Sequence, residues 1–222
     1  MNHGFGFYCL VLPHHLAVRS NSDSTWRLMH GKFSKSSREN SGDLKSISLT
    51  ANITLNGPAM GTVTIMRVVD TSVKFPMFKI GGASTSSIKN ISIANGYNRD
   101  SSGGGIFNQG TLSLEGCSIF SCDANVGGGI YNEKSLTMRA CTVQNNSADD
   151  GAGIACAANA NCVSHLSNTL VKYNTARVKG GGLSILATAS VTIDENSVVG
   201  DNHANAQVSV GGVSTFPVEL SP

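Results

Sequence analysis

A glycine-rich motif recurs at a fixed interval through this chain of 222 residues. GGGIFN begins at Gly103, GGGIYN at Gly127 and GAGIAC at Gly151, each 24 residues after the one before, and GGGLSI follows at Gly180 after 29 residues. Self-similarity at one period is the signature of folds in which each repeat stacks on its neighbours. The repeat therefore predicts an elongated, stacked architecture instead of one globular core.

Apolar residues occupy the same phases in every copy of the repeat. Within a copy they alternate with polar residues, as in Leu112-Ser113-Leu114, and this alternation is the period of a β-strand. Such short strands cannot bury a face alone, so we expect each copy to form one coil, with equivalent residues about 4.8 Å apart in neighbouring coils. The predicted inward columns are Ile106, Ile130, Ile154 and Leu183, continued by Val213; Leu114, Met138, Leu166 and Ile193; Ile119, Val143, Val171 and Val198; and Cys117, Cys141, Thr169 and Asn196.

These columns predict an all-β fold, a parallel solenoid with three short sheets around a dry core. Similar strands upstream, between Ile53 and Ile93, continue the pattern, so about six coils with a period of roughly 24–30 residues are expected over residues 46–216. Stacked asparagine side chains are expected to bond one another and the turn backbone, which satisfies polar groups beside an apolar core. The two stacked pairs are Asn108 with Asn132 and Asn146 with Asn174.

Residues 1–45 differ from the repeat region. They hold six Lys or Arg against three acidic residues and contain the Ser-rich stretch KFSKSSRENS. We expect a separate, poorly ordered or irregular segment here, followed by the solenoid over residues 46–216 and a tail at 217–222. Phe5–Leu12 is similar to the apolar core of a signal peptide, but no Lys or Arg precedes it and Pro13 follows it, so an irregular start is the alternative.

Charge and hydropathy exclude two kinds of partner. The formal net charge of +2 gives no field strong enough to attract nucleic acid. No apolar run approaches the roughly 18 residues of a transmembrane span. Both ends of the predicted solenoid lack an obvious cap, so the chain is expected either to be part of a longer protein or to cover one end with its own N-terminal segment.

The repeat also resembles a known group of proteins. GGGIYN, followed by SLTMRACTVQNNSA and another glycine turn, is similar to the right-handed parallel β-helix repeat of the pectate-lyase-like superfamily and, distantly, to the repeats of polymorphic outer-membrane proteins. The resemblance covers roughly residues 46–216. It implies a right-handed, single-stranded parallel β-helix in a secreted or cell-surface protein, and it does not specify an activity.

Four residues are the best candidates for catalysis, because glycoside hydrolysis needs two carboxylates and a lyase needs a base that takes a proton. These are Asp149, Asp150, Arg177 and Lys179, and an Asp pair followed by Arg-x-Lys resembles polygalacturonases. The Gly-His-Gly of those enzymes is absent, and His165 lies in Ser-His-Leu. The four residues fall at the expected turn before a glycine-rich strand, so solvated turn residues are the alternative interpretation. Asp100, Asp123 and Asp149 are expected near the same turn as an acidic edge, without the DxDxDG spacing of a calcium loop.

Two aromatic residues are candidates for ligand binding. Phe107 and Tyr131 share an outward column and are placed to meet a sugar face or a partner protein; the alternative is that aromatic residues favour an exposed parallel sheet. Histidines near the N-terminus lack the spacing of a tetrahedral metal site, so neither a metal nor a cofactor is predicted. Those residues are His14 and His15, with His3 or Cys9.

The cysteines fall into two groups. Cys117 and Cys141 are expected to stack as small buried side chains. Cys156 and Cys162 flank the residues that lengthen one repeat, and we expect these extra residues to form a loop at a turn. The two cysteines either bridge this loop, in an oxidising compartment, or remain free thiols.

Three classes of function follow from this pattern. The first is a non-catalytic secreted or cell-surface protein, located outside the cell, that adheres to or binds a polysaccharide or protein through an outer sheet face. The second is a polysaccharide lyase or glycoside hydrolase of the pectate-lyase-like superfamily. The third, an ice-binding or purely structural solenoid, is disfavoured because outward threonines do not recur in register. Low charge and the missing catalytic constellation favour the first class.

Overall fold

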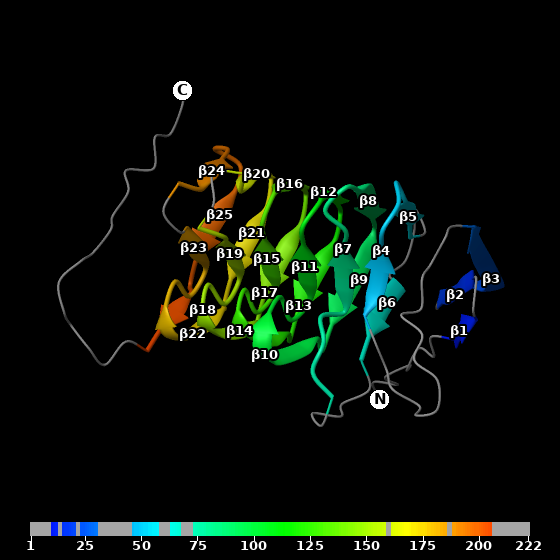
Figure 1. Cartoon of the computed structure of the whole chain (residues 1–222), viewed down its shortest axis with the longest axis horizontal. Coiled ribbons are helices and arrows are strands. Elements are labelled where there is room, and N and C mark those ends of the chain that lie inside the picture. Colours follow the sequence, from blue (N-terminus) through cyan, green and yellow to red (C-terminus); the bar gives the residue numbers. More distant parts are fainter. Residues whose placement is uncertain are drawn as a thin grey trace.

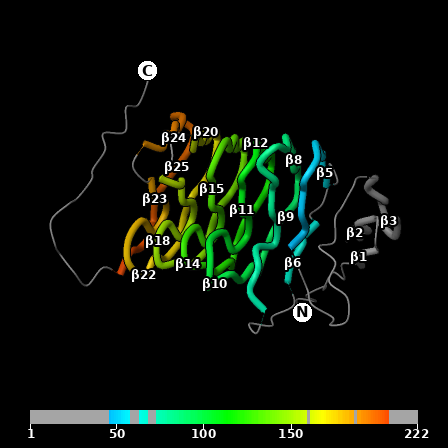
Figure 2. The backbone as a smooth tube through the Cα atoms, viewed as in Figure 1, coloured from blue at the N-terminus to red at the C-terminus, as the bar shows by residue number. Residues whose placement is uncertain are grey.

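The computed structural model describes residues 10–12, 15–20, 23–30, 46–57, 63–67, 73–158, 161–185 and 188–205, the first three ranges as backbone only. The secondary-structure elements of these residues are all β-strands, and none is a helix. From Ile47 onward each strand pairs in parallel with its equivalents in the windings before and after it (Figure 1). Figure 2 shows these windings side by side, from cyan near the first to orange at the last. The predicted all-β parallel solenoid is confirmed.

Four parallel sheets run along the solenoid. Sheet 1 contains β4 (Ile47–Leu49), β7 (Phe78–Ile80), β11 (Ile106–Asn108), β15 (Ile130–Asn132), β19 (Ile154–Cys156) and β23 (Leu183–Ile185). Sheet 2 contains β5 (Thr54–Asn56), β8 (Thr85–Lys89), β12 (Thr111–Glu115), β16 (Ser135–Arg139), β20 (Val163–Ser167) and β24 (Ser190–Ile193). Sheet 3 contains β6 (Val63–Met66), β9 (Ile91–Ala94), β13 (Ser118–Phe120), β17 (Thr142–Gln144), β21 (Leu170–Lys172) and β25 (Val198–Gly200). Sheet 4 contains β10 (Tyr97–Ser102), β14 (Asp123–Val126), β18 (Ser147–Asp150), β22 (Thr175–Lys179) and β26 (His203–Ala204).

The predicted core columns form the interior. Ile106, Ile130, Ile154 and Leu183 pair in register along sheet 1, and Leu114, Met138, Leu166 and Ile193 do so along sheet 2. These side chains, apart from the half-buried Leu183 and Ile193, are fully or almost fully buried. Within the described residues, a first winding of three strands precedes five windings of four, so the expected number of six coils is close.

The predicted register fails in the last winding. Val171 pairs with Val199 instead of Val198, and the N–H of Thr169 meets Ser197 instead of Asn196. Between Ile193 and Val198 the turn is one residue longer than its counterpart between Leu166 and Leu170, since Leu166 pairs with Ile193 and Leu170 with Val198. The added residue shifts everything after it by one position.

The expectation of three sheets is also wrong, because a fourth sheet occupies the segment interpreted as a turn. Its inward positions carry Ala124, Ala148 and Ala176, all fully buried. Alanine fills little space, so this side of the solenoid closes over a small satellite cluster of Ala148, Ala152 and Ala176 while the larger apolar residues gather under the other three sheets.

Glycine triplets carry the chain from sheet 4 into sheet 1 of the next winding. Gly103 has φ of 72°, a left-handed conformation that glycine adopts without a steric penalty. A Cβ on Gly104 would lie 2.5 Å from the carbonyl oxygen of Gly128 in the next winding. The N–H groups of residues 103–106 all bond carbonyls of residues 126–129, so the backbone ladder continues through the turn.

The segment before the solenoid contains β1 (Leu10–Leu12), β2 (His15–Ser20) and β3 (Asp23–His30), which pair antiparallel in that order. The division of the chain at residue 45 and the tail at 217–222 stay predictions. Val213, His3, Cys9 and His14 lie outside the described residues. In the described part of the chain, no helix has the length and apolar character that crossing a membrane requires.

Candidate functional site

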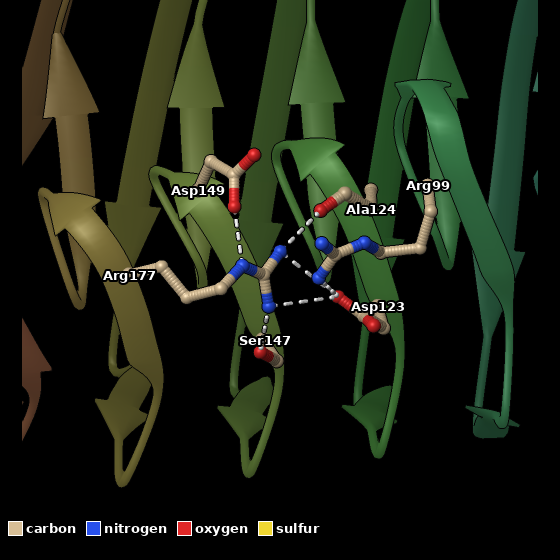
Figure 3. Close-up of polar contacts among 6 residues, drawn as sticks. All are labelled: Arg99, Asp123, Ala124, Ser147, Asp149 and Arg177. Carbon is tan, nitrogen blue, oxygen red and sulfur yellow. Dashed lines mark hydrogen bonds and ion pairs between the residues drawn. The ribbon is translucent and has the colours of Figure 1, made fainter.

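The candidate catalytic residues lie on the strands of sheet 4, where Arg177 of β22 reaches back across two windings (Figure 3). Its Nε donates to Asp149, its Nη1 donates to Ser147 Oγ at 2.8 Å, and its Nη2 donates to the Ala124 carbonyl oxygen at 3.1 Å. Both Nη atoms lie 3.4 Å from Asp123 Oδ1, and Arg99 reaches the same oxygen at 3.5 Å. We call Arg99, Asp123, Ser147, Asp149 and Arg177 the sheet-4 charge cluster.

The charged side chains of the sheet-4 charge cluster pair with one another. Asp149 and Asp123 are engaged by guanidinium groups, and Arg177 uses its nitrogens on four different partners. A carboxylate oxygen that accepts charge-assisted hydrogen bonds from an arginine is already occupied and is not available to a substrate. Arg177 is committed to protein oxygens and is not poised to take a proton. The cluster therefore links four windings, through β10, β14, β18 and β22, and its carboxylates and guanidinium groups are occupied by one another.

The remaining acidic and basic residues of this edge are also paired. Lys179 Nζ lies 3.3 Å from Asp150 Oδ2, and Lys74 Nζ lies 2.7 Å from Asp100 Oδ1. The expected acidic edge of Asp100, Asp123 and Asp149 is thus a row of ion pairs. Asp150 is more deeply buried than Asp149, and its Oδ1 has no hydrogen-bond partner among the described residues. In the same part of the chain, no three His, Cys, Asp or Glu side chains gather as a metal site.

The two candidate aromatic residues stack on the outside of sheet 1. The ring centroids of Phe107 and Tyr131 are 5.5 Å apart with an interplanar angle of 18°, and Lys79 Nζ lies 5.6 Å from the Phe107 ring centroid. Burial, followed by the charge of Glu133, raises the pKa of Tyr131. Beyond Tyr131 the column ends in Ala155 and Ser184, which are buried. The aromatic step is therefore short and only half-exposed.

The predicted asparagine pairs form two buried ladders. Asn108 Nδ2 donates to Asn132 Oδ1 at 2.7 Å, and Asn146 Nδ2 donates to Asn174 Oδ1 at 2.9 Å. The second ladder continues to Asn202, whose Oδ1 accepts from Asn174 Nδ2 at 2.9 Å, and the sequence alignment missed this member. Asn146 and Asn174 also bond backbone groups at the turn after sheet 3. These residues stabilise turns and take no part in a binding site.

Cys156 and Cys162 form a disulfide, with their Cα atoms 5.9 Å apart. The bond closes the loop that lengthens this winding. Cys117, Cys122 and Cys141 are buried free thiols. Burial raises the pKa of Cys122 to about 12, and a hydrogen bond between Cys117 and Cys141 raises the pKa of the second and lowers that of the first. None of these thiols is placed as a nucleophile.

A surface that the sequence analysis missed lies on the outside of sheet 2. At the two central outward columns of β8, β12, β16, β20 and β24, eight of the ten residues are Ser or Thr. We call these eight residues the sheet-2 hydroxyl face: Thr85, Ser87, Thr111, Ser113, Ser135, Thr137, Ser190 and Thr192. Threonine alone recurs in register only from Thr85 to Thr111, whereas hydroxyl groups recur through most of both columns. The available signal was the pattern Ser/Thr-x-Ser/Thr in each repeat.

Stacked parallel strands that wind around one apolar core define a β-solenoid. A family model described as a right-handed β-helix region matches residues 60–200, so this chain belongs to the right-handed β-helix family. This agrees with the resemblance to the pectate-lyase-like superfamily and fixes the hand of the solenoid. Searches of curated proteins and of solved structures gave no match.

Proposed function

We propose that this protein is a non-catalytic, extracellular β-helix protein that binds a polysaccharide through an outer sheet face. The observation that supports it is the closure of the sheet-4 charge cluster, in which the candidate acid and base residues are engaged by one another. The fold hosts enzymes as well as binding proteins, so the proposal rests on the contacts of the site and not on the fold. The outer faces of sheets 1, 2 and 3 remain for recognition of an extended ligand.

The disulfide supports the proposed location. A Cys156–Cys162 bond closes a short loop at the protein surface, and disulfides of this kind persist in oxidising environments such as the outside of the cell. Low charge and a surface rich in uncharged polar side chains fit a protein that adheres through hydrogen bonds and shape. Adhesion to a cell-surface or extracellular polysaccharide is the role that combines these properties.

Binding and product formation must be measured on the same samples. The whole chain is electrophoresed through gels containing xylan, glucomannan, polygalacturonate or alginate, and the same mixtures are assayed for new reducing ends and unsaturated sugars. We expect retardation by at least one polymer and no product. Product that disappears in Asp150→Asn or Arg177→Gln would contradict the proposal and establish a lyase or hydrolase; Lys172→Gln, at a half-exposed residue on sheet 3, is the control.

A further inference from the structure

We infer that the sheet-2 hydroxyl face is the binding surface and that its ligand is a neutral, extended polysaccharide lying across the windings. This inference rests on the proposed function and deepens it. Six of the eight hydroxyl residues, from Thr85 to Thr137, cover three consecutive windings without interruption. Val163 and His165 occupy the equivalent positions on β20, and Ser190 and Thr192 resume the pattern on β24.

The hydroxyl groups of this face are free to bind. All eight residues are exposed or half-exposed, and the structure shows no hydrogen bond from their side chains to other described residues. Stacking places equivalent hydroxyls about 4.8 Å apart, which is beyond hydrogen-bond reach, so neighbouring hydroxyls do not satisfy one another. Each hydroxyl can both donate and accept. The face is therefore a regular grid of unused donors and acceptors.

The grid fits a ligand that carries many hydroxyl groups at short intervals. Its spacing is about 4.8 Å along the solenoid and about 6.6 Å along each strand, where outward residues alternate. A polysaccharide presents donors and acceptors along a repeating chain, so successive sugar units can meet successive windings. A compact small molecule would use only one or two windings and would leave the remaining repetition without a role.

The charge of the face selects a neutral polymer. Among the ten central positions only His165 is titratable. The third outward column borders the grid with Lys89, Glu115 and Arg139, in which Lys89 Nζ and Glu115 Oε2 form an ion pair at 2.7 Å. An acidic polysaccharide would need uncompensated cations along the grid, and the cations of this surface lie only at its margins: Arg139 on one side, and on the other Lys134, whose Nζ donates to the Gly82 carbonyl oxygen at 3.0 Å. A neutral chain of hydroxyl groups needs none.

The other faces are less suitable for an extended ligand. On sheet 4 the outward polar side chains of the charge cluster bond one another and are not available to a ligand. On sheet 1 the aromatic step of Phe107 and Tyr131 ends at the buried Ala155. On sheet 3 the outward column changes from Thr142 to Leu170 and Val198, so its hydroxyls stop where exposed apolar residues begin. Sheet 3 carries one column of four half-exposed hydroxyls in register, Thr64, Ser92, Ser118 and Thr142, whereas sheet 2 carries two adjacent columns, and only these form a two-dimensional grid among the described faces.

A pair of double variants tests this assignment. Ser113→Ala with Thr137→Val removes two hydroxyls that are register neighbours at the centre of the face, while Ser118→Ala with Thr142→Val makes the same change at register neighbours on sheet 3. Both are measured by affinity electrophoresis in xylan, glucomannan, polygalacturonate and alginate, after circular dichroism has shown that each variant is folded. We expect the sheet-2 variant to bind the neutral polymers about tenfold more weakly and the sheet-3 control to bind like the unmodified chain. Binding should also persist in 1 M salt, because no ion pair with the ligand is involved.

Each other outcome overturns a different statement. If the unmodified chain binds a neutral polymer and the sheet-2 variant binds equally well, the face is wrong and the proposed function stands. If it binds only polygalacturonate or alginate, the neutral ligand is wrong. If it binds no polysaccharide, the proposed function fails and this inference fails with it. Thermal hysteresis that the sheet-2 variant abolishes would assign the grid to ice instead.

Discussion

Sheets 2 and 4 share one backbone ladder but treat their outward side chains in opposite ways. On sheet 4, Arg177 and Asp149 carry opposite charges in neighbouring windings, and they form an ion pair with each other. On sheet 2, Ser113 and Thr137 are equivalent hydroxyls in neighbouring windings, and they remain free. When windings stack, side chains of opposite charge in neighbouring windings pair with each other, whereas short hydroxyl side chains do not reach each other and stay available to a ligand. The proposed binding surface accordingly lies where like residues repeat and not where charges gather.

The inner sides of the two sheets differ as strongly. Leu112, Leu114, Leu136 and Met138 fill the core beneath sheet 2, whereas alanines line sheet 4. The side chains buried beneath sheet 2 are therefore large, and those buried beneath sheet 4 are small. Substitutions that put a small residue under sheet 2 or a large residue under sheet 4 should therefore lower the stability most.

The largest effect is expected from Leu136→Ala on β16. The side chain is fully buried, so its removal leaves a cavity and should lower the free energy of unfolding by about 2–5 kcal/mol. Ala148→Leu, on the inner side of sheet 4, should cost about 1–3 kcal/mol through overpacking. Urea denaturation followed by circular dichroism measures both. Thr137→Ala, at the exposed neighbouring residue, is the control. If it lowers the free energy of unfolding as much as Leu136→Ala does, the effect comes from the strand backbone and not from the core.

A smaller effect is expected from Arg177→Met, which removes the centre of the sheet-4 charge cluster. The cluster is roughly one-third exposed, so we expect a loss of about 1 kcal/mol, and less in 1 M salt. Lys179→Met removes a more exposed cation from the same strand and should change stability by less than about 0.5 kcal/mol. Both variants are measured by urea denaturation at low salt and in 1 M salt. Equal losses of stability in the two would contradict a stabilising role for the contacts that Arg177 makes between windings.

The smallest effect concerns Glu115 at the border of the hydroxyl face. The hydrogen bond and charge of Lys89 lower the pKa of Glu115, so its ionised form is favoured in the folded protein. Its contribution to stability is present above the ordinary pKa of the carboxyl group and is lost as the pH falls through the lowered value. A carbon-detected NMR titration should give a higher pKa for Glu115 in Lys89→Met than in the unmodified chain. The same pKa in both proteins would show that the pair is not formed in solution.

Constant period made the central windings predictable. Ile106, Ile130 and Ile154 follow one another at the same interval, so aligning the sequence aligns the strands. The last winding departed because one residue is added at the turn of residues 194–197, and a side-chain period of two gives no warning of a shift between two adjacent valines. Sheet 4 was taken for a turn because alanine and charged residues lack the apolar alternation of a strand.

The sheet-2 hydroxyl face was harder to predict for a chemical reason. Serine and threonine replace one another between windings, so a search for threonine alone finds no column, although Thr111 and Ser135 are register neighbours. The partners of the candidate catalytic residues were equally hidden, because Arg177 contacts residues from two earlier windings. Such contacts depend on the lateral placement of strands, which the order of residues along one repeat does not contain.

The segments from Gly103 to Val126 and from Gly127 to Asp150 are equal in length, and their amides and carbonyls match through the glycine turn. A tandem duplication of either segment would therefore insert a complete winding whose donors meet acceptors already in place. Each insertion would also contribute two more hydroxyl residues to sheet 2, and for a polymeric ligand this raises valency without creating a new kind of contact. A change in the number of repeats would therefore lengthen the hydroxyl face without altering the packing within any one winding.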